Sequence, residues 1–197
     1  MNRKQVMQAG RGLLILALVL AFGCATPDTP GSDNSTKTGT VLRVVSIVAK
    51  DGGTSSNQVD VVIHMCSATE AEKGLFDVDM DVSLMNDSAG SGAQQGTKVT
   101  IISYTVEYIS NDPGSVPLPA ESKVTQSMVI NPGGSVNMTG LLLMSVHTKE
   151  EFISRGGDPG LIPVYQAKVT FYGVNDFGYK VKAVGSTYLE LADWNTC

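Results

Sequence analysis

Apolar and polar residues alternate over most of the chain beyond Thr40, with the two-residue period of half-buried β-strands. The clearest case is 77–84, which reads DVDMDVSL without a fault. A phase slip at Ile102 and Ser103 predicts a β-bulge within the segment 99–108. The other predicted strands are 41–48, 59–65, 123–130, 135–144, 164–172 and 179–191.

Residues that favour turns separate these segments, because Gly, Pro, Asn and Asp cluster between them. The predicted turns are 51–53, 111–114, 131–134 and 173–178. One segment, 148–156, departs from the β pattern: Thr148 and Glu151 form a capping box, and Gly156 can end a helix. Many short strands with one short helix predict an all-β protein, an antiparallel sandwich of about 7–9 strands.

Two segments near the C-terminus resemble the last two strands of an immunoglobulin or fibronectin type III domain. They read YQAKVTFYG at 165–173 and GYKVKAVG at 178–185. In these families a tyrosine near the start of the penultimate strand hydrogen-bonds through its hydroxyl, and Tyr165 occupies that place. The Cys…Trp…Cys pattern of true immunoglobulin domains is missing, since the single Trp is Trp194. The resemblance implies an immunoglobulin-like β-sandwich that presents or binds rather than catalyses.

The N-terminus carries three basic residues in its first eleven positions, followed by an apolar run at 13–22. A helix needs roughly twenty apolar residues to cross a bilayer, so this run is too short for a transmembrane anchor. A positive segment followed by a short apolar run is typical of a secretory signal peptide. An ordinary signal peptide, the alternative, would end in an A-x-A-like site, whereas this run ends at Gly23 and Cys24.

The tract LAFGC at 20–24 resembles the lipobox of bacterial lipoproteins. The resemblance implies that residues 1–23 are removed and that Cys24 is acylated by chains such as palmitate, which hold the protein to a membrane. In enterobacterial lipoproteins an Asp after the acylated Cys retains the protein at the inner membrane. Ala25 in that position implies the outer membrane, and the leaflet stays open.

The segment 24–39 contains no large apolar residue. It cannot bury enough surface to offset its ordering entropy, so we expect a lipidated, disordered tether before a β-sandwich domain at 40–197. Without the three basic residues of the signal peptide, the 14 Lys and Arg fall to 11 against 19 Asp and Glu, a net charge of −8. Phosphate backbones repel such a domain, which argues against nucleic acid as a partner.

Two cysteines remain besides Cys24, namely Cys66 and Cys197. In an oxidising compartment we expect them to form a disulfide that closes a loop of about 130 residues and restrains the unfolded chain by roughly 4–5 kcal/mol. Two free thiols are the alternative. A catalytic cysteine is not expected, because only His64 and His147 could activate one.

Asp77, Asp79 and Asp81 share one face of a predicted strand. Three carboxylates about 7 Å apart could bind a hard cation such as calcium, which takes six to eight oxygen ligands. The alternative is a solvated, solubilising face. His64 and Cys66 also share a face, but a structural zinc site needs about four ligands, and the sequence supplies no others at a recognisable spacing.

No nucleophile motif, phosphate-binding loop or cofactor signature occurs in the sequence. We therefore predict a non-enzymatic lipoprotein of the cell envelope, without a cofactor, whose β-sandwich is a structural or interaction module. Its expected partners are the membrane, through Cys24, and an envelope protein or surface polymer. The alternative is a ligand-binding module for calcium or carbohydrate.

Overall fold

The computed structural model describes residues 34–35, 40–62, 75–88 and 96–194. The described chain forms two five-stranded β-sheets, one of which curls like half a barrel, and one short α-helix. The strands are β1 (Asn34–Ser35), β2 (Thr40–Asp51), β3 (Thr54–Ser55), β4 (Gln58–Asp60), β5 (Val78–Asn86), β6 (Val99–Ile109), β7 (Glu121–Ile130), β8 (Ser135–Met144), β9 (Val164–Asn175) and β10 (Lys180–Ala192). The helices are α2 (Val146–Ser154) and the 3-10 turn η1 (Pro159–Leu161).

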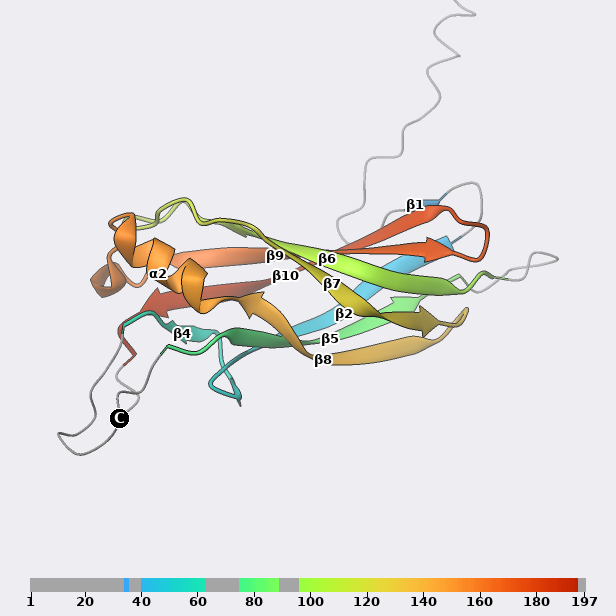
Figure 1. The fold of residues 1–197 in the computed structure, drawn as a ribbon, viewed down its shortest axis with the longest axis horizontal. Coiled ribbons are helices and arrows are strands. Elements are labelled where there is room, and N and C mark those ends of the chain that lie inside the picture. Colours follow the sequence, from blue (N-terminus) through green and yellow to red (C-terminus); the bar gives the residue numbers. More distant parts are fainter. Residues whose placement is uncertain (1–33, 36–39, 63–74, 89–95, 195–197) are drawn as a thin grey trace, which may run out of the picture.

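The two sheets lie face to face (Figure 1). The first has the order β1-β2-β5-β8, with β3 also pairing with β2, and the second has the order β4-β10-β9-β6-β7. The β4–β10 pair is parallel, whereas the other pairs of described strands are antiparallel. The chain turns back at Gly52 and Gly53 into β3 and turns again before β4, so β4 runs in the direction of β2 and alongside β10. The prediction of a β-rich fold is confirmed, and this parallel pair departs from the expected all-antiparallel arrangement.

The predicted strands agree with the observed ones apart from a few residues at their ends. The predicted bulge is confirmed, because the register of β6 against β9 shifts between Ile101 and Ser103. The largest difference concerns the predicted strand 59–65, of which the structure shows only β4, while the positions beyond Val62 lie outside the described residues. Local alternation therefore locates strands well but does not show how long each one stays paired.

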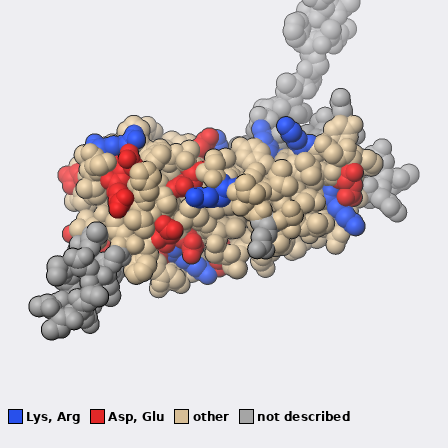
Figure 2. Space-filling view, viewed as in Figure 1, with Lys and Arg blue, Asp and Glu red and all other residues tan. Residues whose placement is uncertain are grey.

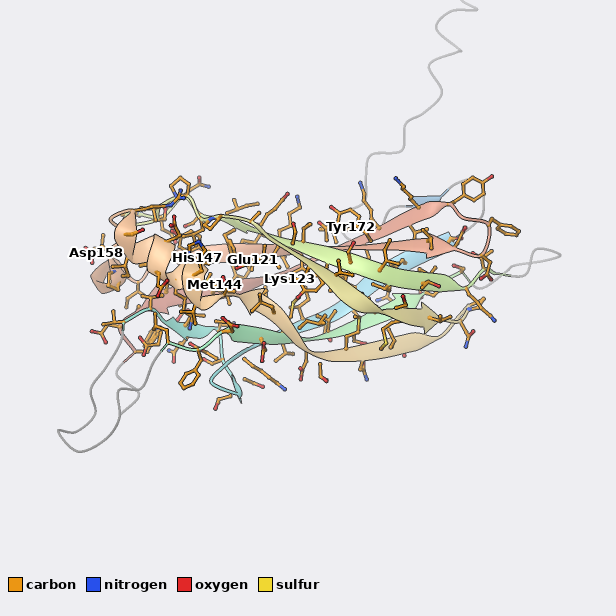
Figure 3. All side chains as sticks on the ribbon, in the orientation of Figure 1. Glu121, Lys123, Met144, His147, Asp158 and Tyr172 are labelled. Carbon is orange, nitrogen blue, oxygen red and sulfur yellow. The ribbon has the colours of Figure 1, made fainter. Side chains whose placement is uncertain are left out.

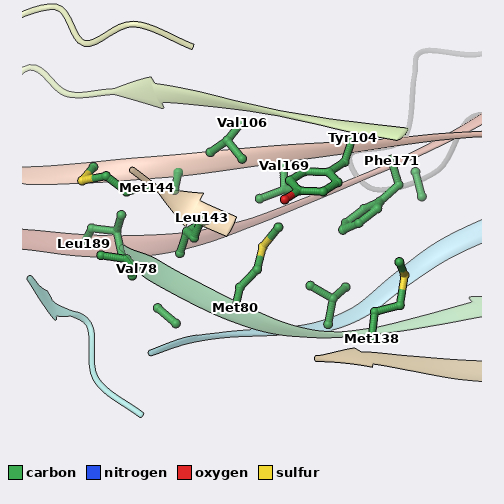
Figure 4. Close-up of a cluster of buried hydrophobic side chains, with 14 of the residues drawn as sticks. Val78, Met80, Tyr104, Val106, Met138, Leu143, Met144, Val169, Phe171 and Leu189 are labelled. Carbon is green, nitrogen blue, oxygen red and sulfur yellow. The ribbon is translucent and has the colours of Figure 1, made fainter. Parts of the chain in front are cut away.

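Inward-facing side chains of the two sheets form one hydrophobic core (Figure 4). On β5 every second residue is buried, and Met80 and Leu84 are completely inaccessible to solvent. On the second sheet, which faces β5, the rings of Tyr104 on β6 and Phe171 on the neighbouring β9 pack with centroids 5.7 Å apart. Complete burial of an aliphatic or aromatic side chain stabilises a fold by about 1.5–3 kcal/mol, so the period-two pattern supplies much of what holds the sheets together.

α2 begins earlier than the sequence predicted. Ser145 is its N-cap, since the Ser145 Oγ accepts a hydrogen bond from the N–H of Thr148 at 3.2 Å. The predicted capping box of Thr148 with Glu151 is therefore wrong. The reason is tertiary, because the Ser145 Oγ also donates to Glu121 on the distant β7 at 2.5 Å. The predicted end of the helix is confirmed, as Gly156 follows the last turn with a φ of +84°.

The elongated pair of sheets has two ends of different construction (Figure 1). The α2 end contains α2, β4 and the last residues of β10. At the opposite end, here named the hairpin end, the turn between β9 and β10 lies beside the start of β2, and Asn175 Nδ2 donates to Thr40 Oγ1 at 3.1 Å.

Candidate functional site

The α2 end holds the most deeply buried charge of the described residues. The side chain of Lys149 on α2 is only 1% exposed, and its Nζ lies 3.2 and 3.3 Å from the two carboxylate oxygens of Asp51 at the end of β2. Asp51 is itself positioned, because its Oδ2 accepts the N–H of Asp60 on β4 at 2.9 Å. Asp51 therefore links the helix, through the ion pair, and β4 of the second sheet, through this hydrogen bond, to β2 of the first sheet.

Burial lowers the pKa of Lys149, because the protein interior solvates an ammonium group poorly. The charges of Asp51, Asp60 and Asp77 act in the opposite direction and offset only part of this shift. A lysine with a lowered pKa occurs in some catalytic sites. Here, however, the amine donates to a carboxylate and is closed off from solvent, so the arrangement fits an internal ion pair better than a nucleophile.

A second polar cluster surrounds Glu121 at the start of β7, beside α2 (Figure 3). Its Oε1 accepts hydrogen bonds from the Ser145 N–H at 3.1 Å, the Ser145 Oγ at 2.5 Å and the Thr148 Oγ1 at 2.7 Å. Burial raises the pKa of Glu121, but these hydrogen bonds and the nearby Lys123 charge outweigh burial and hold the pKa below its usual value. Glu121 is therefore an ionised acceptor at neutral pH rather than a proton donor.

Two tyrosines of β6 reach across to β8 in the other sheet. The Tyr104 hydroxyl donates to the carbonyl oxygen of Leu142 at 2.9 Å, and the Tyr108 hydroxyl donates to that of Leu143 at 2.5 Å. Burial raises the pKa of Tyr104 to about 12 and also raises the pKa of Tyr108. Both hydroxyls keep their protons near neutral pH and act as ties between the sheets.

Replacing Glu121 by Gln should lower the free energy of unfolding by about 1–3 kcal/mol near neutral pH, because the hydrogen bonds from Ser145 and Thr148 lose their charged acceptor. Folding lowers the pKa of Glu121, so its contribution is present above the unfolded-state pKa and is lost as the pH falls through the folded-state pKa. Urea unfolding at about pH 7 and about pH 3 should show a difference between wild type and variant that shrinks at the lower pH.

Glu107→Gln is the matched control for this prediction. Glu107 also lies on a strand and pairs with a lysine, Lys168, at 2.9 Å, but its side chain is 52% exposed. Exposed ion pairs contribute less than about 1 kcal/mol. Equal losses in the two variants, or a loss at Glu121 that is independent of pH, would contradict the stabilising role.

The predicted calcium ligands Asp77 and Asp81 have different partners in the structure. Asp77 precedes β5, and its Oδ1 accepts the N–H of Val146 at 2.8 Å. Asp81 lies 2.5 Å from the Lys50 Nζ, and this ion pair lowers the pKa of Asp81. Asp79 lies between them on β5. Among the described residues no group of three or more His, Cys, Asp or Glu side chains is arranged to hold a metal ion, and calcium binding stays a prediction.

Of the other residues singled out in the sequence, namely the three cysteines and two histidines, the structure describes only His147. Cys24, His64, Cys66 and Cys197 lie outside the described residues. His147 is exposed on the first turn of α2 (Figure 3).

Sequence reasoning missed both polar clusters. One available signal was the spacing of Lys149 and Phe152, which places them on the same face of a helix and buries both. The role of Glu121 had no local signal, since its partners lie 24 and 27 residues away.

Exposed apolar side chains gather on the outward face of the second sheet. The strand register places Val124 of β7 opposite Ser103 of β6, which in turn lies opposite Tyr172 of β9. The side chains of Val124, Val129, Ile102 and Tyr172 are 87%, 56%, 41% and 38% exposed. We name these four residues the β7 patch. β7 is also the outer strand of its sheet.

No helix within the described ranges has both the length and the hydropathy needed to span a bilayer. No protein-family model matches the chain, and a search of curated proteins gives no match. Among solved structures, the chain is similar to a Bordetella pertussis protein assigned as ApaA, with 12% identity and a TM-score of 0.41 over 83% of this chain and 97% of that one. At this identity and score the likeness bears on neither the detailed fold nor the function.

Proposed function

We propose that the two sheets form an immunoglobulin-like β-sandwich. In that fold strands A, B and E share one sheet, and strands C, F and G share the other. By chain order and pairing, β2, β5 and β8 correspond to A, B and E, while β6, β9 and β10 correspond to C, F and G. β7 then lies beside C, where variable-type domains carry an added strand.

Tyr165 lies at the start of β9, the place of the corner tyrosine in immunoglobulin-like domains, but its hydroxyl makes a different contact. Its hydroxyl donates to the carbonyl oxygen of Val116 at 2.8 Å and accepts the N–H of the same residue at 2.7 Å. Val116 lies 49 residues upstream, whereas the tyrosine of immunoglobulin domains bonds to backbone only a few residues away. Tyr165 therefore braces the loop that precedes β7.

We propose that the chain is a lipoprotein of the outer membrane, anchored through Cys24, whose sandwich binds an envelope protein or surface polymer and has no catalytic activity. The observation that carries the binding role is the β7 patch. Apolar side chains grouped on a surface are typical of interaction sites, because water solvates them poorly. An outer strand also offers backbone N–H and C=O groups with which a partner strand can pair.

A photo-crosslinking amino acid at position 124 tests this surface in cells that produce the full-length protein. We expect a defined covalent adduct, because Val124 is 87% exposed and is the most exposed side chain of the β7 patch. The matched control is the same amino acid in place of Val48, which is 43% exposed on β2 of the other sheet.

Val124→Lys in a chain that carries the crosslinker at position 129 should weaken the adduct, since a charge would have to be buried against the partner. Equal labelling from positions 124 and 48, or labelling from neither, would contradict a binding role for the patch.

A further inference from the structure

Hydrogen bonds from the backbone to Asn175 brace the turn between β9 and β10, which presents two aromatic rings to solvent. The Asn175 Oδ1 accepts the N–H groups of Phe177 and Tyr179, both at 3.0 Å, and Gly178 adopts a φ of +78° that suits glycine. Phe177 is 69% exposed and Tyr179 is 48% exposed. The core does not require either ring in this position.

β1, the first described strand of the chain, also lies at the hairpin end. Asn175 bonds to Thr40 at the start of β2, and β1 pairs with that start through Ser35 and Thr40. Only nine residues separate Cys24 from Asn34 in the sequence. The flexible tether that the sequence predicts for these residues would span roughly 17 Å. That length is less than half of the about 40 Å covered by the 13 residues of β10.

Charge distinguishes the two ends. Lys98 and Lys180 are exposed beside the hairpin turn, where Asp176 accepts the N–H of Lys98 at 3.1 Å. Arg43 also lies toward this end and pairs with Asp87 at 2.7 Å.

The α2 end, by contrast, exposes Asp112, Glu150, Asp158 and Asp193. On the face shown in Figure 2, acidic side chains gather mainly over this α2 end. An anionic membrane surface therefore repels the α2 end and tolerates the hairpin end.

We propose that the hairpin turn, through Phe177 and Tyr179, inserts into the headgroup region of the bilayer that holds the lipid on Cys24. Aromatic rings favour this region because it accepts an apolar ring and solvates a phenolic hydroxyl, and lysines beside them meet lipid phosphates. The sandwich then stands on the membrane with its α2 end outward. This inference rests on the proposed lipid anchor.

Tryptophan fluorescence tests the insertion in the full-length, membrane-purified protein. Trp194 is the single tryptophan of the chain, and it lies beyond the end of β10 at the α2 end. Phe177→Trp combined with Trp194→Phe moves the fluorophore to the hairpin. In phosphatidylcholine–phosphatidylglycerol vesicles with acyl chains brominated near the headgroup, we expect Trp at 177 to lose fluorescence at least about twofold.

The matched control is Ile153→Trp in the same Trp194→Phe background, because Ile153 is 42% exposed on α2. Its fluorescence should stay unchanged in brominated vesicles. If the protein floats with the vesicles but Trp at 177 is not quenched more than Trp at 153, the insertion is wrong and the anchor stands. If the purified chain does not float with vesicles, the anchor is wrong and the insertion falls with it.

Discussion

Asp51→Ala should lower the free energy of unfolding by about 3–5 kcal/mol, because it leaves the Lys149 ammonium buried without its partner. The side chain of Lys149 is 1% exposed, so water cannot replace the lost carboxylate without opening the α2 end. Urea unfolding monitored by far-ultraviolet circular dichroism and by Trp194 fluorescence measures the loss.

Lys149→Met removes the charge of the ion pair but keeps a long apolar side chain, so it distinguishes the contribution of the charge from that of side-chain packing. Asp51 is 14% exposed and keeps its hydrogen bond from Asp60, so we expect this variant to lose less stability than Asp51→Ala. Adding Lys149→Met to Asp51→Ala should recover stability, because the unpaired buried charge disappears. If the double variant is as unstable as the sum of the two single variants, the pair does not act as a unit.

The pH dependence of Asp51→Ala follows from the same burial. Burial lowers the pKa of Lys149, so protonation of the amine disfavours the folded state. This penalty is complete below the folded-state pKa and disappears as the pH rises above the unfolded-state pKa. The deficit of Asp51→Ala should therefore shrink in alkaline buffer.

Cys24→Ala should abolish lipid attachment completely, because the thiol is the only proposed acceptor for the diacylglycerol. Intact-mass analysis of wild-type protein purified from membranes should give the mass of residues 24–197 plus acyl groups. The variant should lack those acyl groups, and the uncleaved residues 1–23 should remain. An anchor of two or more acyl chains holds a protein stably at a membrane, whereas a single chain does so only marginally.

Cys66→Ala is the control for the mass experiment, since it also removes one thiol and should leave the acylation unchanged. Wild-type protein that retains Met1, or that carries an unmodified Cys24, would contradict the anchor. The outer-membrane assignment and the expected pairing of Cys66 with Cys197 would then lose their basis as well.

The strands were predictable because their signal is local. Every second residue of β5 faces the core, and the extra residue at Ile102 shifts the phase of β6 within the sequence itself. The start of α2 was not predictable in this way. Thr148 and Glu151 satisfy the local rule for a capping box, yet Ser145 caps the helix because Glu121 holds it from another strand.

The candidate sites depend even more than the helix start on contacts between residues that are far apart in the sequence. The sequence brought Asp77, Asp79 and Asp81 together as neighbours on one strand, but Asp81 pairs with Lys50 and Asp77 binds the backbone at the start of α2. The buried ion pair joins residues 98 positions apart, and the β7 patch combines side chains from three strands.

The sequence by itself determined the positions of the strands and turns, since these depend on the alternation of neighbouring residues and on turn chemistry. It also carries the whole argument for export and for a lipid on Cys24. Only the tertiary structure decided which strands pair, which charges are buried and which apolar residues stay at the surface. Those outcomes depend on contacts between residues far apart in the chain, and no local pattern specifies which distant segment will cover a given side chain.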